Sequence, residues 1–262
     1  MNARCLRHLL ALILGLLFVV TVFPTFAADK PAAKMPTAGT ISDRWVVWPK
    51  ADHAREFEAA IKEYVAWMKK AGDAFDWAAY QPIVGTDLTY YVFRSDGHQW
   101  KDFDAEEVWR TKANDNAQFG KLVGPHVAKV EHFFVEFDAD HSHTVGNPRD
   151  YKYYQGVTYR VKPGAGADAM AAIDKIHKAL QSQKWAYPYR LEWQTGGRDG
   201  LRIVNQFKSY ADMADPTPTV REVLTKALGA EDAAATLKQF GSSLERVDDT
   251  IGVSRPDLST QK

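Results

Sequence analysis

The stretch Trp-Val-Val-Trp-Pro at residues 45–49 decides the fold, because a related stretch, Tyr-Arg-Val-Lys-Pro, recurs at residues 159–163. Both read as strands, and each precedes a helical pattern. In the first pattern, stripe positions run from Phe57 to Met68 at spacings of four, three and four residues. In the second pattern they run from Met170 to Leu180 at spacings of three, four and three. The chain therefore contains an internal duplication.

The elements after each helix repeat as well. The dipeptide Trp-Ala begins an extended stretch in each copy, and a strand-like run follows the next glycine, at residues 88–93 and 201–207. Strand, turn and strand predict an antiparallel hairpin. A second helical pattern at residues 105–122 and 220–237 and a last apolar stretch complete each copy. The order strand, helix, strand, strand, helix, strand is that of the ferredoxin-like unit.

The sequence thus predicts an α+β protein built from two tandem ferredoxin-like βαββαβ units. We place the first unit at residues 43–137 and the second at residues 154–253. A linker rich in Asp, His, Asn and Pro joins them at residues 138–153. Residues 254–262 are expected to form a disordered tail.

Residues 1–27 have the pattern of a secretory signal peptide. A basic segment precedes an apolar run from Leu9 to Val20, and small side chains stand at Thr25 and Ala27. An uncleaved membrane anchor is the competing interpretation, although the run is shorter than the roughly 20 residues needed to cross a bilayer. We expect cleavage near Ala27, a periplasmic or secreted mature protein, and a flexible linker at residues 28–42.

Composition excludes several classes of function for the mature protein. The one cysteine, Cys5, lies inside the predicted signal peptide and would leave with it, so no disulfide or thiolate site is expected. Cleavage would also remove two of the 33 basic residues and none of the 33 acidic ones. A chain with so little net charge suggests neither a nucleic-acid partner nor membrane association after cleavage.

The strands of the first copy carry apolar side chains on both faces. Residues 45–48 and 90–93 do not alternate, as the strands of a sheet with one wet face would. Helices can cover one face only. The other face must therefore meet a second sheet, a partner subunit or a ligand.

This tandem arrangement resembles the dimeric α/β-barrel superfamily, in which two ferredoxin-like sheets pack face to face. The superfamily includes antibiotic-biosynthesis-type monooxygenases, stress-responsive barrel proteins and NIPSNAP-like proteins, with haem-binding chlorite dismutases and dye-decolorising peroxidases as larger relatives. The resemblance covers residues 43–253 and rests on element order and duplication, so it transfers no catalytic residue. It implies a pseudo-dimeric barrel with antiparallel sheets, and leaves open closure within one chain or between the two chains of a homodimer.

One face of the second sheet is polar, since charged side chains alternate there with apolar ones. Burying these charges against aromatic groups is costly unless they are paired or bound to a ligand. Either the face lines a cavity for an anionic or polar small molecule, or it is wet. An active surface is expected on this second copy, and the candidate ligand-binding residues are Arg160, Arg190, Glu192 and Arg202.

Imidazoles and carboxylates gather around the start of the linker. Such groups suit zinc or another first-row cation, but polar linkers commonly contain them, so we predict no metal site. The weak candidates are His132, Asp138, Asp140, His141 and His143. His177 lies on the apolar stripe of its helix, where it is either a hydrogen-bonded core residue or, by the resemblance, a haem ligand. We predict no cofactor.

The function expected from these observations is the binding of a small, partly aromatic molecule by an exported barrel protein. Whether the protein is also an enzyme stays open. A cofactor-independent monooxygenase-like activity is the alternative, followed by haem binding, and both rest on the resemblance alone.

Overall fold

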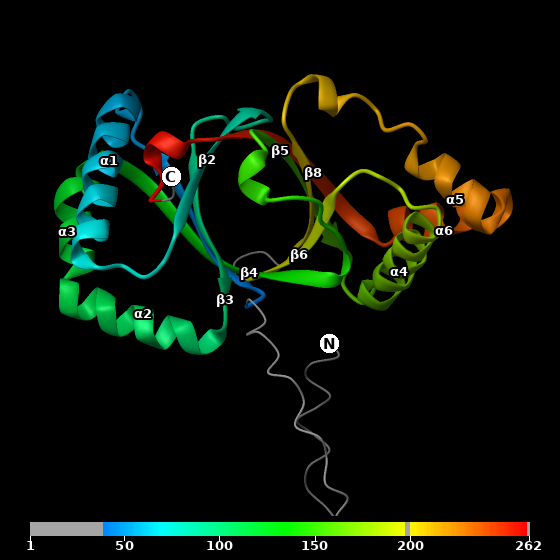
Figure 1. Cartoon of the computed structure of the whole chain (residues 1–262), viewed down its shortest axis with the longest axis horizontal. Coiled ribbons are helices and arrows are strands. Elements are labelled where there is room, and N and C mark those ends of the chain that lie inside the picture. The colour runs from blue at the N-terminus through cyan, green and yellow to red at the C-terminus, as the bar shows by residue number, and fades with distance from the viewer. Residues whose placement is uncertain (1–38, 197–199, 261–262) are drawn as a thin grey trace, which may run out of the picture. The chain divides into compact units, whose positions relative to one another are not determined.

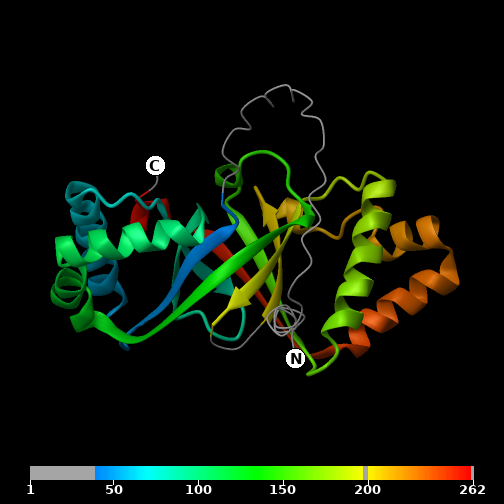
Figure 2. The ribbon, with the colours of Figure 1, turned by 90° about the horizontal axis from the view of Figure 1, so that it is seen from below.

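The computed structural model describes residues 39–196 and 200–260. The predicted signal peptide, at residues 1–27, and most of the predicted linker at residues 28–42 lie outside the described residues. Within them, eight antiparallel strands close a barrel in the order β1-β3-β2-β8-β5-β7-β6-β4. Helices α1 to α3 pack outside one half of the barrel and α4 to α6 outside the other (Figure 1, Figure 2).

Each copy supplies four strands and three helices to the part of the chain that is described. The first copy contributes β1 (Ile41–Pro49), α1 (Ala54–Ala71), β2 (Trp77–Val84), β3 (Tyr91–His98), α2 (Trp100–Ala113), α3 (Asp115–Leu122) and β4 (Val127–His143). The second contributes β5 (Tyr153–Val161), α4 (Gly166–Ser182), β6 (Tyr189–Thr195), β7 (Gly200–Phe207), α5 (Val220–Leu228), α6 (Ala230–Ser242) and β8 (Leu244–Ser254). Among these helices none is long and apolar enough to cross a membrane.

The predicted ferredoxin-like units are confirmed, and the barrel closes within one polypeptide. The strand order is β4-β1-β3-β2 in the first copy and β8-β5-β7-β6 in the second. Two antiparallel seams join the copies: β2 pairs with β8, with Tyr80 opposite Ser254, and β4 pairs with β6, with Phe137 opposite Glu192. Because both seams form inside the chain, the barrel is complete without a second subunit.

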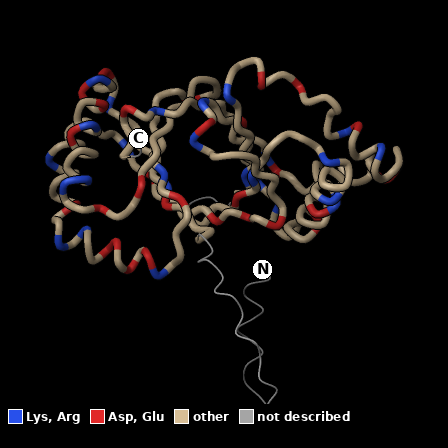
Figure 3. Tube along the Cα trace, in the orientation of Figure 1, with Lys and Arg blue, Asp and Glu red and all other residues tan. Residues whose placement is uncertain are grey.

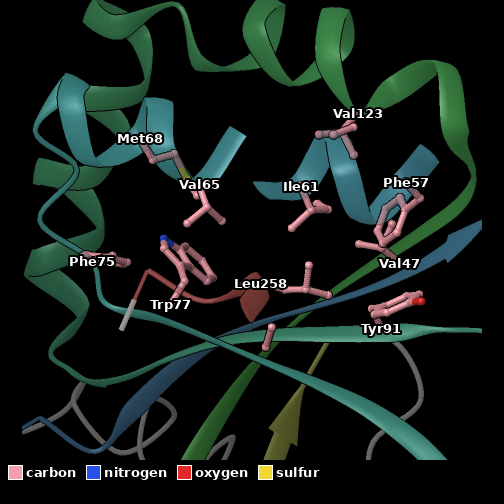
Figure 4. Close-up of a cluster of buried hydrophobic side chains, with 12 residues drawn as sticks. Val47, Phe57, Ile61, Val65, Met68, Phe75, Trp77, Tyr91, Val123 and Leu258 are labelled. Atoms are coloured by element: carbon pink, nitrogen blue, oxygen red, sulfur yellow. The ribbon is translucent and has the colours of Figure 1, made fainter. Parts of the chain in front are cut away.

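The two-sided apolar pattern of β1 is explained by its position between helices and barrel interior. Trp45 and Val47 face α1, whereas Val46 faces the second sheet across the barrel and is 5% exposed. The predicted stripe of α1 is buried on the outer face of the first sheet, where Phe57 is fully buried (Figure 4). The free face of the first sheet thus meets the second sheet, which is one of the three alternatives that the pattern left open.

The second helical region is broken at the same place in both copies, where the sequence predicted one continuous helix. Asn114 separates α2 from α3 with a φ of 56°, and Gly229 separates α5 from α6 with a φ of 86°. Asn114 takes the left-handed conformation that commonly ends a helix, whereas Gly229, with a ψ of 161°, takes an extended conformation at positive φ that is open chiefly to glycine. The repeated break is thus a property of the duplicated unit.

Two predicted boundaries differ from the structure. Strand β4 runs to His143, well into the predicted linker, because its end pairs with β6, with His143 opposite Tyr189. The predicted disordered tail packs on the first copy as far as it is described, since Leu258 is fully buried and Trp77 N donates to Thr260 Oγ1 at 2.6 Å. These residues have partners far away in sequence, which local composition does not reveal.

Candidate functional site

A pocket of about 310 Å³ lies between the outer face of the first sheet and helices α1 and α3. It exists because the stripe of α1 and the outward side chains of the sheet meet without filling the space between them. Figure 4 shows Val65 of α1 pointing toward Trp77 of β2, with Met68 to one side and Ile61 above Leu258 on the other. The apolar lining consists of Trp45, Val47, Ile61, Val65, Met68, Trp77, Phe93, Phe119 and Val130.

The rim of the pocket is polar at the start of α3. The Tyr64 hydroxyl donates a hydrogen bond to Asp115 Oδ1, and Asp115 is 4% exposed. Burial and the neighbouring carboxylate raise the pKa of Tyr64 far above its ordinary value, so its hydroxyl stays protonated at neutral pH. Asn116 lines the rim beside them and adds an amide with both donor and acceptor capacity.

Arg110 of α2 supplies a cation at the same rim. Its Nε donates to Glu106 Oε1 at 2.9 Å, and its guanidinium lies over the Trp45 ring, 5.6 Å from the ring centroid. Burial opposes the charge of Arg110, but the hydrogen bond to Glu106 and the nearby carboxylates outweigh burial and raise its pKa. The guanidinium is therefore a fixed positive group.

A histidine–aspartate pair supports the sheet wall of the pocket. His132 stacks on Trp45 with 3.9 Å between ring centroids, and its Nε2 lies 2.6 Å from Asp43 Oδ1. The second oxygen of Asp43 lies 3.9 Å from Arg110 Nη2, so one buried carboxylate holds both residues. These contacts fix the plane of the Trp45 indole.

The arrangement suits the binding of a flat, apolar molecule. Aromatic and aliphatic walls provide dispersion contacts, and a few polar groups at one end can orient a substituent. At the rim the Arg110 guanidinium lies with the carboxylate of Asp115, and Asp43 and Glu106 contact it from behind. A neutral substituent such as a hydroxyl or carbonyl therefore suits it better than a second anion.

The structure brings together three of the four residues predicted to bind a ligand. They do not lie at the apolar pocket. Arg190, Glu192 and Arg202 line a separate cavity inside the barrel, and Glu192 is 1% exposed, so this face is not wet. Arg160 lies farther along β5, opposite Arg246 of β8, and does not line that cavity.

The residues considered for a metal do not come together. His132 is held by Asp43, and His141 Nδ1 lies 3.0 Å from Asp138 Oδ2. His143 packs its ring near Tyr189, and Asp140 is exposed. No group of three or more His, Cys, Asp or Glu side chains that could hold a metal ion occurs in residues 39–196 and 200–260.

His177 does not fit the haem alternative. Its Nδ1 lies 2.9 Å from the Tyr189 hydroxyl, and the His141 ring packs edge-on against it at 5.8 Å. Asp174 lies three residues before His177 on α4, with its Oδ1 3.8 Å from His141 Nε2. Imidazoles and carboxylates surround the ring, where a porphyrin would need broad apolar walls. We derive no chemistry through haem.

The pocket in the first copy was missed from the sequence, although two signals pointed to it. The run Asn-Asp-Asn at residues 114–116 interrupts a helical pattern with residues typical of helix ends. The first copy also holds six of the eight tryptophans, large side chains suited to a pocket or a core, and Trp45 and Trp77 line the pocket. This pocket lies in the first copy, whereas the sequence led us to expect an active surface on the second copy.

Comparisons with known proteins bear on the fold. No protein-family model and no curated protein matches the sequence. Among solved structures, a double mutant of chlorite dismutase from Candidatus Nitrospira defluvii is similar with a TM-score of 0.51 and 8% identity, over 86% of this chain and 96% of that one. The same enzyme in complex with imidazole gives 0.50 and 9%, over 84% and 93%. An anthrone oxidase-like protein gives 0.49 and 10%, over 85% and 94%.

At these identities the similarity concerns the fold alone. The strand order, the two ferredoxin-like halves and the helices outside the sheets agree with it. The chain therefore has the dimeric α/β-barrel fold, with both halves of the barrel supplied by one polypeptide.

Proposed function

We propose that this protein binds a small, flat, mainly apolar molecule with one neutral polar substituent in the pocket between the first sheet and helices α1 and α3. The observation that carries the proposal is the pocket itself, a space of about 310 Å³ walled by Trp45, Trp77 and Phe93. A pocket of this size with a mainly apolar lining and a few polar groups at its rim has the character of a small-molecule site.

The size of the pocket limits the ligand. An apolar cavity of about 150 Å³ is sufficient to hold benzene. A space of about 310 Å³ therefore admits a molecule with one or two fused rings. Arg110, Asn116 and the Tyr64–Asp115 pair would contact the substituent at the rim.

Isothermal titration calorimetry with 2-naphthol tests the proposal. We expect saturable binding with one site per chain, and at least tenfold weaker binding of 2-naphthalenesulfonate, whose charge meets the carboxylates of the rim. The Val65→Phe variant places a ring inside the pocket and should weaken 2-naphthol binding by at least tenfold, which corresponds to about 1.4 kcal/mol. Unchanged binding by this variant would exclude the pocket.

A matched pair of surface variants guards against effects of misfolding. Val130 lines the pocket and is 39% exposed, and its counterpart in the second copy, Val247, is 51% exposed. Val130→Trp should obstruct the pocket and reduce affinity for 2-naphthol, whereas Val247→Trp should bind like the wild type. Equal effects of the two changes would argue against this site.

We further propose that the protein acts after export, as a periplasmic or secreted protein. The order of basic, apolar and small residues in positions 1–27 supports this. Mass spectrometry of the protein recovered from the periplasm or medium should give a mature chain beginning at Ala28. Recovery of the intact chain from the membrane fraction would favour the uncleaved anchor instead.

A further inference from the structure

The interior of the barrel carries an excess of positive charge. Inward-facing side chains from both sheets surround a cavity of about 70 Å³, separate from the apolar pocket. In Figure 3, basic positions lie on strands of both halves of the barrel. The charged groups that line the cavity are four arginines and two carboxylates, namely Arg44, Arg94, Arg190, Arg202, Asp96 and Glu192.

Arg94 forms ion pairs with both carboxylates, and Arg190 lies beside Glu192 alone. Arg94 Nη1 lies 2.8 Å from Glu192 Oε1, and its Nε donates to Asp96. Arg94 also donates from Nη2 to Ser42 Oγ at 2.9 Å. Arg190 Nε lies 3.5 Å from Glu192 Oε1, and its guanidinium lies over the Phe137 ring. Two of the four cations are thereby compensated.

Arg44 and Arg202 have no such partner. Neither forms an ion pair or a side-chain hydrogen bond with any residue of the described chain, and the Nε atom of each is closed to solvent. Burial and the positive charges of Arg202 and Arg94 lower the pKa of Arg44 to about 9. Both arginines are only partly exposed, and a cation without a partner in such surroundings is unfavourable, so these two guanidiniums favour the binding of a counter-charge.

The surroundings leave room for that counter-charge and add neutral donors. The Arg202 guanidinium lies across Gly156, where any Cβ atom would come within 2.1 Å of its Nη2. Tyr80 and Tyr154 also line the cavity, with their rings packed edge to face at 4.7 Å. Burial raises the pKa of Tyr80 to about 12, so its hydroxyl keeps its proton at neutral pH.

We infer that the barrel interior is a binding site for a small tetrahedral oxyanion, sulfate or hydrogen phosphate, held by Arg44 and Arg202. The two uncompensated charges match a dianion, and planar guanidinium groups bind such oxyanions through paired hydrogen bonds. A cavity of about 70 Å³ suits the free ion rather than an organic ester. The inference does not depend on the ligand of the apolar pocket.

Thermal unfolding of the full protein in sodium sulfate, in sodium phosphate and in sodium chloride at equal ionic strength tests the inference. We expect sulfate and phosphate to raise Tm in a saturable manner, by roughly 5–10 °C at a hundredfold excess over Kd. Because sulfate also stabilises proteins without binding, the comparison is with Arg202→Met and Arg44→Met, which should lose the saturable response. A wild-type response that equals the response of both variants would overturn the inference.

The same variants distinguish an anion site from a structural role of the arginines. Without added sulfate or phosphate, Arg202→Met should unfold at the same Tm as the wild type or higher, because it removes an uncompensated cation. Arg94→Met should unfold at a lower Tm, because it leaves Asp96 and Glu192 without their main partner. An Arg202→Met variant as destabilised as Arg94→Met would contradict the proposed site.

Discussion

Glu106 lies on α2 behind the pocket rim, with 5% of its surface exposed. Burial raises the pKa of its carboxyl from 4.5 to about 7, against the hydrogen bond from Arg110. Between these values the native protein binds more protons at Glu106 than the unfolded chain does, so this group lowers stability as pH rises through that range. We expect Glu106→Gln to be more stable than the wild type at pH 8, by about 1–3 kcal/mol.

Urea unfolding at pH 4, 6 and 8 measures this difference. The advantage of Glu106→Gln should shrink toward acid pH and vanish at pH 4, where the wild-type carboxyl is protonated in both states. Glu107→Gln changes an exposed neighbour on the same helix and should show no such trend. An advantage that grows toward acid pH would refute the assignment.

At the scale of single residues, an inward-facing charged side chain could be predicted only where charged and apolar residues alternate along a strand. Arg190, Glu192 and Arg202 alternate with apolar side chains, so their common face could be predicted. Arg44 and Arg94 share the same cavity, but they stand in strands that are apolar on both faces, where a single inward charge has no pattern. The size and place of the apolar pocket could not be predicted, because they depend on how the surfaces of α1, α3 and the first sheet fit together.

At the scale of elements, the order of strands and helices within each copy could be predicted from the duplication. The breaks between α2 and α3 and between α5 and α6 could not. Asn114 stands between two stretches of helix formers, so the composition favours one continuous helix across it. Gly229 lies 115 positions later, at the matching place in the second copy, and is a second indication of a helix break there. The break matters for function because it starts α3 at Asp115, which brings that carboxylate to the pocket rim.

The C-terminal segment is an element of the first copy's core, although the second copy precedes it in the chain. Leu258 is fully buried among side chains of α1 and the first sheet. We expect Leu258→Ala to lower the free energy of unfolding by about 2–5 kcal/mol, the usual cost of such a cavity. Urea unfolding measures this, with Leu88→Ala, 46% exposed, as the control. A loss below about 1 kcal/mol would show that the segment contributes little to the core.

At the scale of the whole molecule, both sheets of the barrel meet inside one chain. The seams β2–β8 and β4–β6 leave no unpaired strand edge in the barrel as described. The homodimer considered from the sequence would therefore have to use helices or loops rather than strand pairing. The fold class could be predicted from the sequence, but closure within one chain or between two stayed open, because that choice depends on seam contacts distant in sequence.

The packing of Leu258 into the first copy also sets the order in which the molecule can be assembled. The first copy is synthesised before the second, yet Leu258, which completes its interior, follows the second copy in the chain. Until then β2 and β4 lack their seam partners and present open edges. Folding must therefore wait for long-range contacts, which are slow to form. We expect a chain cut between the copies to yield two fragments that associate through their unpaired strand edges, rather than two independent domains.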